Sequence, residues 1–209
     1  MKVVFRIKPL TRILKWTERA LFACAALFLG YCGFAVVDAW SFQRSESIDL
    51  DRLLADQRVV SHGVAAGAGG GGPIGRIEIP RLGLSVVVVE GIGKTTLRRA
   101  AGHIPGTALP GQPGNVGISG HRDTFFRPLK DLKIKDEIQF STVNGDFRYV
   151  VESLTVVDPN NVGVLAPTSE NQLTLVTCYP FFYIGAAPKR FVVRAWQIPA
   201  QALARSIVK

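Results

Sequence analysis

Three side chains of reactive type stand where runs with strand character begin or end: Cys178, His121 and Arg190. Cys178 ends the run Leu-Thr-Leu-Val-Thr, His121 follows Asn-Val-Gly-Ile-Ser-Gly, and Arg190 opens Phe-Val-Val. A cysteine thiolate can attack a carbonyl carbon, a neighbouring histidine can carry the proton, and a guanidinium can stabilise the oxyanion. The three residue types therefore indicate acyl transfer by a cysteine nucleophile at the rim of a β-domain.

Other interpretations of the same residues remain open on spacing alone. A free thiol is largely protonated at neutral pH, so this chemistry needs a histidine or a cation beside it. A single cysteine is otherwise often a small core residue, and an arginine at a strand end is often a solvated charge. A zinc site built from His103, His121 and Cys178 is disfavoured, because no CxxC or HxxxH pair preorganises it. We expect no metal site.

Two further features come close to known motifs without matching them. Residues 91–96 (GIGKTT) resemble the end of a phosphate-binding loop, but Val88 occupies the position where that motif needs its first glycine. This segment therefore predicts a turn and a short helix. Of the other histidines, we expect His62 to be inert in a stalk and His103 to be structural in a loop rich in glycine and proline.

The segment that must position the reactive residues has a strand-rich pattern. Asn144-Gly145 between two apolar runs is a strong hairpin signal. Helix signals are short, over residues 95–101 and 159–165. This pattern predicts an all-β domain of seven or eight strands forming a closed or nearly closed barrel. The expected strands cover residues 74–80, 84–90, 115–119, 136–143, 146–157, 172–179 and 190–198.

The N-terminal segment has the charge pattern of a membrane anchor. Six basic residues and one acidic residue precede residue 20, and residues 20–37 carry no charge. Eighteen apolar residues are close to the length that spans a hydrocarbon core, with Trp16 and Trp40 at its ends. A cleaved signal peptide is the alternative, but its apolar region is shorter and ends in a small-x-small site. We expect a single-pass plasma-membrane anchor with a cytoplasmic N-terminus.

The location of the charge bears on the partners. The formal net charge is +9, of which +5 lies in the first 19 residues (six basic minus one acidic), leaving +4 on the other 190. This distribution favours membrane lipid over nucleic acid as a partner. Cys24 and Cys32 fall in the apolar segment, so Cys178 is the only cysteine of the exported part and has no disulfide partner there.

Three motifs resemble those of the sortases, the membrane-anchored cysteine transpeptidases of bacterial surfaces. Residues 174–178 (TLVTC) resemble the TLxTC signature, and GNVGISGHRDTFFRPLKDL around His121 is similar to the sortase histidine segment. PKRFVVRA supplies an arginine, Arg190, twelve residues after Cys178. The resemblance covers nearly all of residues 74–198, and the motif sequences are most similar to those of class D sortases.

The resemblance implies a closed eight-stranded sortase-type β-barrel with one or two short helices and a two-step reaction. Cys178 would cleave a C-terminal LPxTG-like or LPxTA-like sorting signal and form a thioacyl enzyme, which an amine such as a cell-wall precursor would release. His121 would be the acid and base, and Arg190 would hold the substrate and its oxyanion. Thr177 would help to position the signal. The partners would be surface proteins carrying such signals.

The charge pattern, the glycine-rich composition and the resemblance together set the expected domain organisation. Residues 1–19 form a cytoplasmic basic segment, 20–40 the transmembrane anchor, 41–72 an extracytoplasmic stalk with a glycine-rich linker, 73–199 the catalytic barrel and 200–209 a tail. For residues 41–58, an amphipathic helix and a mobile stalk are equally compatible with the sequence.

Some family features are missing from the sequence, and two other functions are weighed. The Asp-Pro-aromatic lid of pilin-polymerising sortases is absent. No cofactor is expected, and calcium dependence stays open, because the acidic residues form no recognisable loop from which it could be read. The alternatives are a hydrolase that passes the acyl group to water, and a non-catalytic anchored β-domain that binds a surface partner. The second offers no reason for Cys178, His121 and Arg190 together on one rim.

Overall fold

The structure, a computed structural model, describes residues 8–59 and 73–199. The chain divides into two units, Met1–Ser41 and Phe42–Lys209. The predicted glycine-rich linker, His62 and the predicted tail at residues 200–209 lie outside the described residues.

One long helix, α1, covers Lys8–Val59. Its part from Leu14 to Ile48 is long and apolar enough to cross a membrane, which fits a single-pass anchor. The helix continues through residues 41–58, so the helical alternative for this segment is the one observed. The sequence permits this because neither glycine nor proline occurs between residues 34 and 62.

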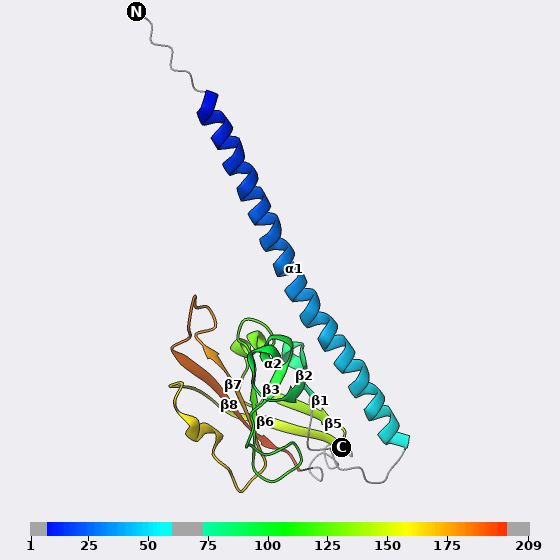
Figure 1. Ribbon diagram of the computed structural model, residues 1–209. Helices are drawn as coiled ribbons and strands as arrows, with labels where there is room; N and C mark the ends of the chain where they lie inside the picture. The colour runs from blue at the N-terminus through cyan, green and yellow to red at the C-terminus, as the bar shows by residue number, and fades with distance from the viewer. Residues whose placement is uncertain (1–7, 60–72, 200–209) are drawn as a thin grey trace, which may run out of the picture. The chain divides into compact units, whose positions relative to one another are not determined.

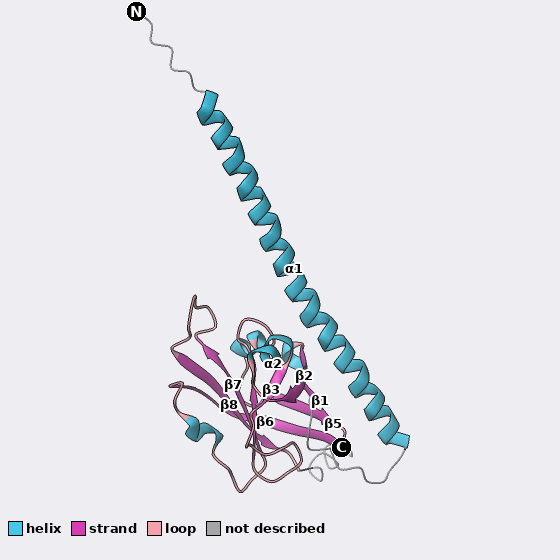
Figure 2. Cartoon of the chain, in the orientation of Figure 1, coloured by secondary structure: helices cyan, strands magenta, loops and turns pink. Residues whose placement is uncertain are grey.

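Within the described residues, eight strands close a barrel in the order β1-β2-β3-β4-β7-β8-β6-β5 (Figures 1 and 2). Neighbouring strands pair antiparallel except for β2 with β3 and β4 with β7, which are parallel. The predicted closed eight-stranded barrel is thereby confirmed. The strands are β1 Pro73–Ile79, β2 Leu84–Glu90, β3 Ala101–His103, β4 Asn115–Ser119, β5 Glu137–Thr142, β6 Gly145–Val157, β7 Gln172–Tyr179 and β8 Lys189–Gln197.

Strand β2 is buried on both faces, as its continuous run of valines predicts. Val86 and Val88 belong to the main core of the barrel. Val87 and Val89 point the other way and pack with Ala100 in a second, smaller cluster. Each fully buried valine contributes about 1.5–3 kcal/mol through the hydrophobic effect, so both faces help to fix this strand.

The structure departs from the expected elements at the short segments. The helix α2 covers Lys94–Arg99, one residue earlier at its start and two at its end than expected, and β3 follows it directly. The possible helix at 159–165 is a 3₁₀ turn, η3, at Val162–Leu165. Two more 3₁₀ turns, η1 (Pro80–Leu82) and η2 (Arg127–Asp131), were not predicted. Three to six residues are too few to establish a periodicity.

The hairpin signal at Asn144-Gly145 is confirmed. Strands β5 and β6 pair antiparallel up to Thr142 and Gly145. Gly145 has a φ of 136°, a backbone conformation that side-chain-bearing residues rarely adopt.

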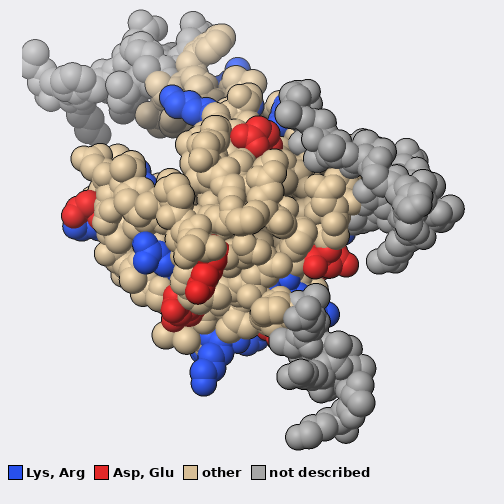
Figure 3. All heavy atoms as spheres, turned by 90° about the horizontal axis from the view of Figure 1, so that it is seen from below, with Lys and Arg blue, Asp and Glu red and all other residues tan. Residues whose placement is uncertain are grey.

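On the face of the molecule in Figure 3, lysine and arginine side chains are interspersed with aspartate and glutamate.

Candidate functional site

Three neighbouring strands bring the predicted site residues to one end of the barrel. Strand β7 pairs in parallel with β4 on one side and antiparallel with β8 on the other. The C-terminal ends of β4 and β7 therefore lie beside the N-terminal end of β8. Apolar side chains that point into the core hold these strands in place, among them Ile118, Leu175 and Val193, each fully buried.

Cys178 and Arg190 are direct partners in the ladder between β7 and β8. Side chains alternate along a strand, so Thr177 points into the barrel, where it is 2% exposed, and Cys178 points outward. Cys178 and Arg190 are both half-buried. The Arg190 Nη1 donates to the carbonyl oxygens of Ala187 and Lys189 at 3.3 and 3.0 Å.

His121 lies just beyond the end of β4, at the level of Cys178. The parallel register pairs Ser119 with Val176, and the Gly120 N–H continues the ladder by donating to the Val176 carbonyl at 3.2 Å. The buried Thr177 hydroxyl donates to the Gly120 carbonyl at 2.7 Å. His121 is exposed, and continuing this register two residues past the pair of Ser119 with Val176 brings its backbone level with that of Cys178.

The turn after β4 is tightly packed beneath His121. A Cβ atom at Gly120 would lie 2.7 Å from the ring of Phe126, which is fully buried. The His121 carbonyl accepts hydrogen bonds from the N–H groups of Thr124 and Phe126 at 3.4 and 3.0 Å. The backbone of His121 is thus held on both sides of its Cα atom, which limits the positions of its ring.

A buried polar network at the N-terminal ends of β4 and β7, away from the site, was not anticipated from the sequence. The Thr174 hydroxyl donates to Asn115 Oδ1 at 2.7 Å and accepts from Gln172 Nε2 at 2.8 Å. Asn115 Nδ2 donates to the carbonyls of Val164 and Ala166, each at 3.2 Å, and so holds the η3 segment against β4 and β7. The available signal was a polar residue at apolar positions of a strand, because such groups require partners when buried.

Arg122 was also overlooked. It follows His121 directly, yet it is only 6% exposed, and its guanidinium donates to carbonyls of the loop between β7 and β8. A charge next to a candidate catalytic histidine was a signal in the sequence, but nothing in the sequence showed that its side chain turns inward.

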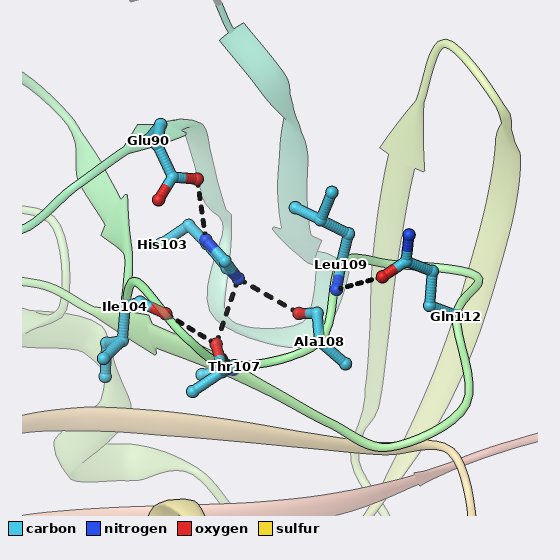
Figure 4. Close-up of polar contacts among 8 residues, drawn as sticks. Glu90, His103, Ile104, Thr107, Ala108, Leu109 and Gln112 are labelled. Carbon is cyan, nitrogen blue, oxygen red and sulfur yellow. Dashed lines mark hydrogen bonds and ion pairs between the residues drawn. The ribbon is translucent and has the colours of Figure 1, made fainter. Parts of the chain in front are cut away.

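His103 has the structural role expected of it, but it ends strand β3 and does not lie in a loop. It is 3% exposed, and its Nδ1 lies 2.8 Å from a carboxylate oxygen of Glu90 (Figure 4). Its Nε2 lies 3.0 Å from both the Ala108 carbonyl and the Thr107 hydroxyl. Because both ring nitrogens have partners in the protein, His103 has none to offer a metal ion. Among the described residues, no three His, Cys, Asp or Glu side chains are grouped so that they could hold one.

Comparison with known proteins gives a consistent result. A family model described as the sortase domain matches residues 77–198. Sortase D of Bacillus subtilis (strain 168) is 34% identical over 120 residues, which are 57% of this chain and 61% of that protein. Sortase SrtE1 of Streptomyces coelicolor is 35% identical over 125 residues, 51% of this chain and 36% of that protein. The aligned part therefore spans less than two thirds of either relative.

A solved structure is also similar. The sortase D5 transpeptidase of Clostridium perfringens aligns with a TM-score of 0.63 and 26% sequence identity. The alignment covers 76% of this chain and 99% of that one.

Proposed function

The chain belongs to the sortase family, and on this premise we propose that it is a membrane-anchored cysteine transpeptidase that acts on C-terminal sorting signals. Residues 73–199 are the proposed catalytic barrel. The observation that carries the proposal is the pairing of Cys178 with Arg190 in adjacent strands, with His121 two residues beyond the end of β4, which pairs with β7 on its other side. A nucleophile, a proton carrier and an anion donor thereby share one end of the barrel.

In the proposed first step, the Cys178 thiolate attacks the threonine carbonyl of an LPxTG-like or LPxTA-like signal. The carbon–sulfur bond forms, and the oxyanion accepts hydrogen bonds from Arg190. The carbon–nitrogen bond to glycine or alanine then breaks, and His121 protonates the leaving amine. The product is a thioester between Cys178 and the shortened protein.

In the second step, an acceptor amine attacks the thioester carbonyl and gives its proton to His121. The carbon–sulfur bond breaks, and the Cys178 thiolate is regenerated as the new amide forms. Nucleophile, proton carrier and anion donor all come from protein side chains, so the proposed reaction requires no cofactor. The proposed acceptor is an amine at the cell surface, such as that of a cell-wall precursor.

Arg190 suits the task of oxyanion donor through its geometry. A guanidinium has five N–H donors in a planar arrangement, and the contacts of Nη1 with the carbonyls of Ala187 in the β7–β8 loop and Lys189 in β8 fix its orientation. Thr177 is proposed to help position the signal. It would do so indirectly, because its hydroxyl donates a hydrogen bond to the Gly120 carbonyl and so fixes the strand end that carries His121.

The proposed location follows from the N-terminal segment. The basic residues before residue 20 favour a cytoplasmic N-terminus, which puts the barrel outside the cytoplasm. The proposed clients are surface proteins with a C-terminal sorting signal, which would be reached there by an anchored enzyme. Membrane lipid surrounds the anchor in this arrangement.

The test uses the full chain of 209 residues in detergent micelles. A panel of LPxTG and LPxTA peptides is incubated with several primary amines, and the products are analysed by mass spectrometry. We expect cleavage after threonine and joining of the new carboxyl end to the amine. Release of the free acid alone at every amine concentration would identify a hydrolase instead, and no cleavage of any peptide would contradict both functions.

A further inference from the structure

Arg122 is a buried arginine in a segment that is otherwise exposed. His121 before it and Asp123 after it are both exposed, whereas Arg122 is 6% exposed. Its Nε lies 3.4 Å from a carboxylate oxygen of Asp123, whose side chain is 67% exposed. Burying a guanidinium is costly unless its N–H groups are hydrogen-bonded, so the partners of Arg122 indicate what this burial achieves.

Those partners are carbonyls of one loop, residues 180–188, which joins β7 to β8. Nη1 donates to the Pro180 carbonyl at 2.8 Å. Nη2 donates to the carbonyls of Tyr183 and Gly185 at 2.8 and 3.2 Å. One guanidinium thus connects the start, middle and far part of the loop, and it does so from the residue next to His121.

The loop exposes much apolar surface. Phe182 and Tyr183 are 73% and 48% exposed, and Ile184 is fully exposed. Its base packs where Phe181 contacts the ring of Phe191 with centroids 5.3 Å apart. The guanidinium of Arg122 lies over the Tyr183 ring, 5.8 Å from its centroid. Apolar side chains that face solvent do little to hold a loop in one conformation, so hydrogen bonds to the loop's backbone carbonyls must contribute much of that ordering.

The loop connects two of the proposed catalytic residues. Pro180 is two residues after Cys178, and Ala187, three residues before Arg190, accepts a hydrogen bond from the Arg190 guanidinium. Arg122 and Arg190 therefore hold the two halves of the same loop. A change in the first half alters the support of the second and, with it, the direction of the Arg190 donors.

We propose that Arg122 is a positioning residue that holds the loop 180–188 in the conformation in which Cys178 and Arg190 act together with His121. The proposal rests on the proposed function. It assigns Arg122 no contact with the substrate: it acts through the carbonyls of Pro180, Tyr183 and Gly185. Lysine cannot replace it fully, because a single ammonium cannot reach three separated carbonyls in the geometry of a planar fork.

The test compares Arg122→Gln and Arg122→Lys with Arg127→Gln in the full chain. Arg127 is a matched control, because it is exposed and its guanidinium lies over the ring of Phe182 in the same loop, 5.5 Å from the centroid. Three quantities are measured: the rate of thioester formation at saturating peptide, the rate of Cys178 alkylation by a small reagent, and hydrogen exchange of the loop amides.

We expect Arg122→Gln to slow thioester formation at least about tenfold, because small misplacements of reacting groups are costly. Arg122→Lys should recover part of that loss, and Arg127→Gln should stay within about twofold of the wild type. Alkylation should change much less than thioester formation, since a small reagent needs the Cys178 thiolate but not the oxyanion donor or the acid that protonates a leaving amine. Loop amides should exchange faster in both Arg122 variants, whereas the strands keep their protection, which shows that the barrel remains folded.

Unchanged thioester formation in Arg122→Gln and Arg122→Lys would overturn the proposal, as would unchanged exchange of the loop. If Arg122→Gln does not fold, the rate of thioester formation and the hydrogen exchange of the loop in Arg122→Lys test the proposal. A wild-type chain that forms neither thioester nor transfer product contradicts the proposed function itself. That outcome is distinct from a loss confined to the Arg122 variants.

Discussion

Cys178 on β7 and Arg190 on β8 face each other as Cα partners in an antiparallel ladder, although Arg190 lies twelve positions further along the chain. Side chains of such partners lie on the same face of the sheet, with Cβ atoms about 5 Å apart. The strand pairing alone thus delivers a guanidinium to the neighbourhood of a thiol. The rest of the site depends on how the turn after β4 and the loop after β7 are held.

The planar geometry of the Arg190 guanidinium provides the first prediction. If Arg190 donates to the oxyanion, lysine cannot reproduce the geometry, and loss of such a donor costs about a hundredfold to a thousandfold in rate. We expect kcat/KM of Arg190→Lys to fall by at least about a hundredfold, close to Arg190→Ala. Thiol alkylation measured against pH should shift only modestly, because the charge is retained. Turnover near that of the wild type would show that charge alone suffices.

Thr177 provides the second prediction. Thr177→Val removes the hydroxyl that donates to the Gly120 carbonyl while keeping the side-chain shape. Losing this buried bond costs about 1 kcal/mol, so the melting temperature should fall by a few degrees. Activity should fall too, because the strand end before His121 loosens. Thr177→Ser keeps the hydroxyl and should restore both. If Thr177→Val raises KM but leaves the melting temperature unchanged, this indirect role is contradicted, and Thr177 contacts the peptide directly.

The pH dependence of stability gives a third prediction. Arg81 donates to the Asp136 carboxylate, which is also bound by the Lys133 N–H at 2.7 Å. These contacts, above all the hydrogen bond from Arg81, lower the pKa of Asp136 below its ordinary value. A carboxyl group with a lowered pKa stabilises the fold above its unfolded-state pKa, and this contribution disappears as the pH falls through the folded-state value.

Asp136→Asn should therefore lower the melting temperature by a few degrees at neutral pH. The difference from the wild type should shrink as the solution is acidified below about pH 4, where the unfolded carboxyl group becomes protonated. Glu170→Gln serves as the control for general loss of a surface carboxylate, because Glu170 is exposed. A difference that stays constant down to pH 2 would contradict the assigned role of the ion pair with Arg81.

The orientation in the membrane gives a fourth prediction. A thiol reagent that cannot cross membranes should label Cys178 in intact cells, or in spheroplasts if there is an outer membrane. The label should be missing in Cys178→Ala, in which Cys24 and Cys32 remain within the apolar part of α1. Labelling of Cys178 only after lysis would place the barrel on the cytoplasmic side and contradict the charge-based orientation.

The sequence predicted the barrel because its long strands carry their own pattern. The run of valines predicted a strand buried on both faces, and Asn144-Gly145 predicted a hairpin turn; both predictions were confirmed. Strand β3 was missed because Ala101–His103 is too short to show alternation, and it exists through pairing with β2 and β4. Such pairing depends on residues far away in the chain.

The site was predictable to the level of residue types at strand ends. That Cys178 pairs with Arg190 depends on the register between β7 and β8, which no local pattern specifies. The inward turn of Arg122 was beyond prediction, because the three carbonyls that compensate its burial belong to a loop 58 to 63 residues further along the chain. The residues around Arg122 in the sequence do not indicate such distant partners.

The account depends most on Cys178 as the nucleophile. We expect Cys178→Ala to abolish cleavage and transfer while the barrel stays folded, since a half-buried thiol outside the core contributes little to stability. Cys178→Ser should be almost as inactive, because a serine hydroxyl lacks the nucleophilicity of a thiolate. The double variant Cys24→Ala with Cys32→Ala is the matched control and should keep its activity.

The most direct measurement is mass spectrometry of the full-length protein mixed with a cleavable sorting-signal peptide in the absence of an amine. The predicted result is a thioester adduct whose mass equals the peptide up to its threonine, located on the fragment that contains Cys178. Adding an amine should remove the adduct and release the joined product. An adduct on another residue, or cleavage that proceeds in Cys178→Ala, would contradict the account.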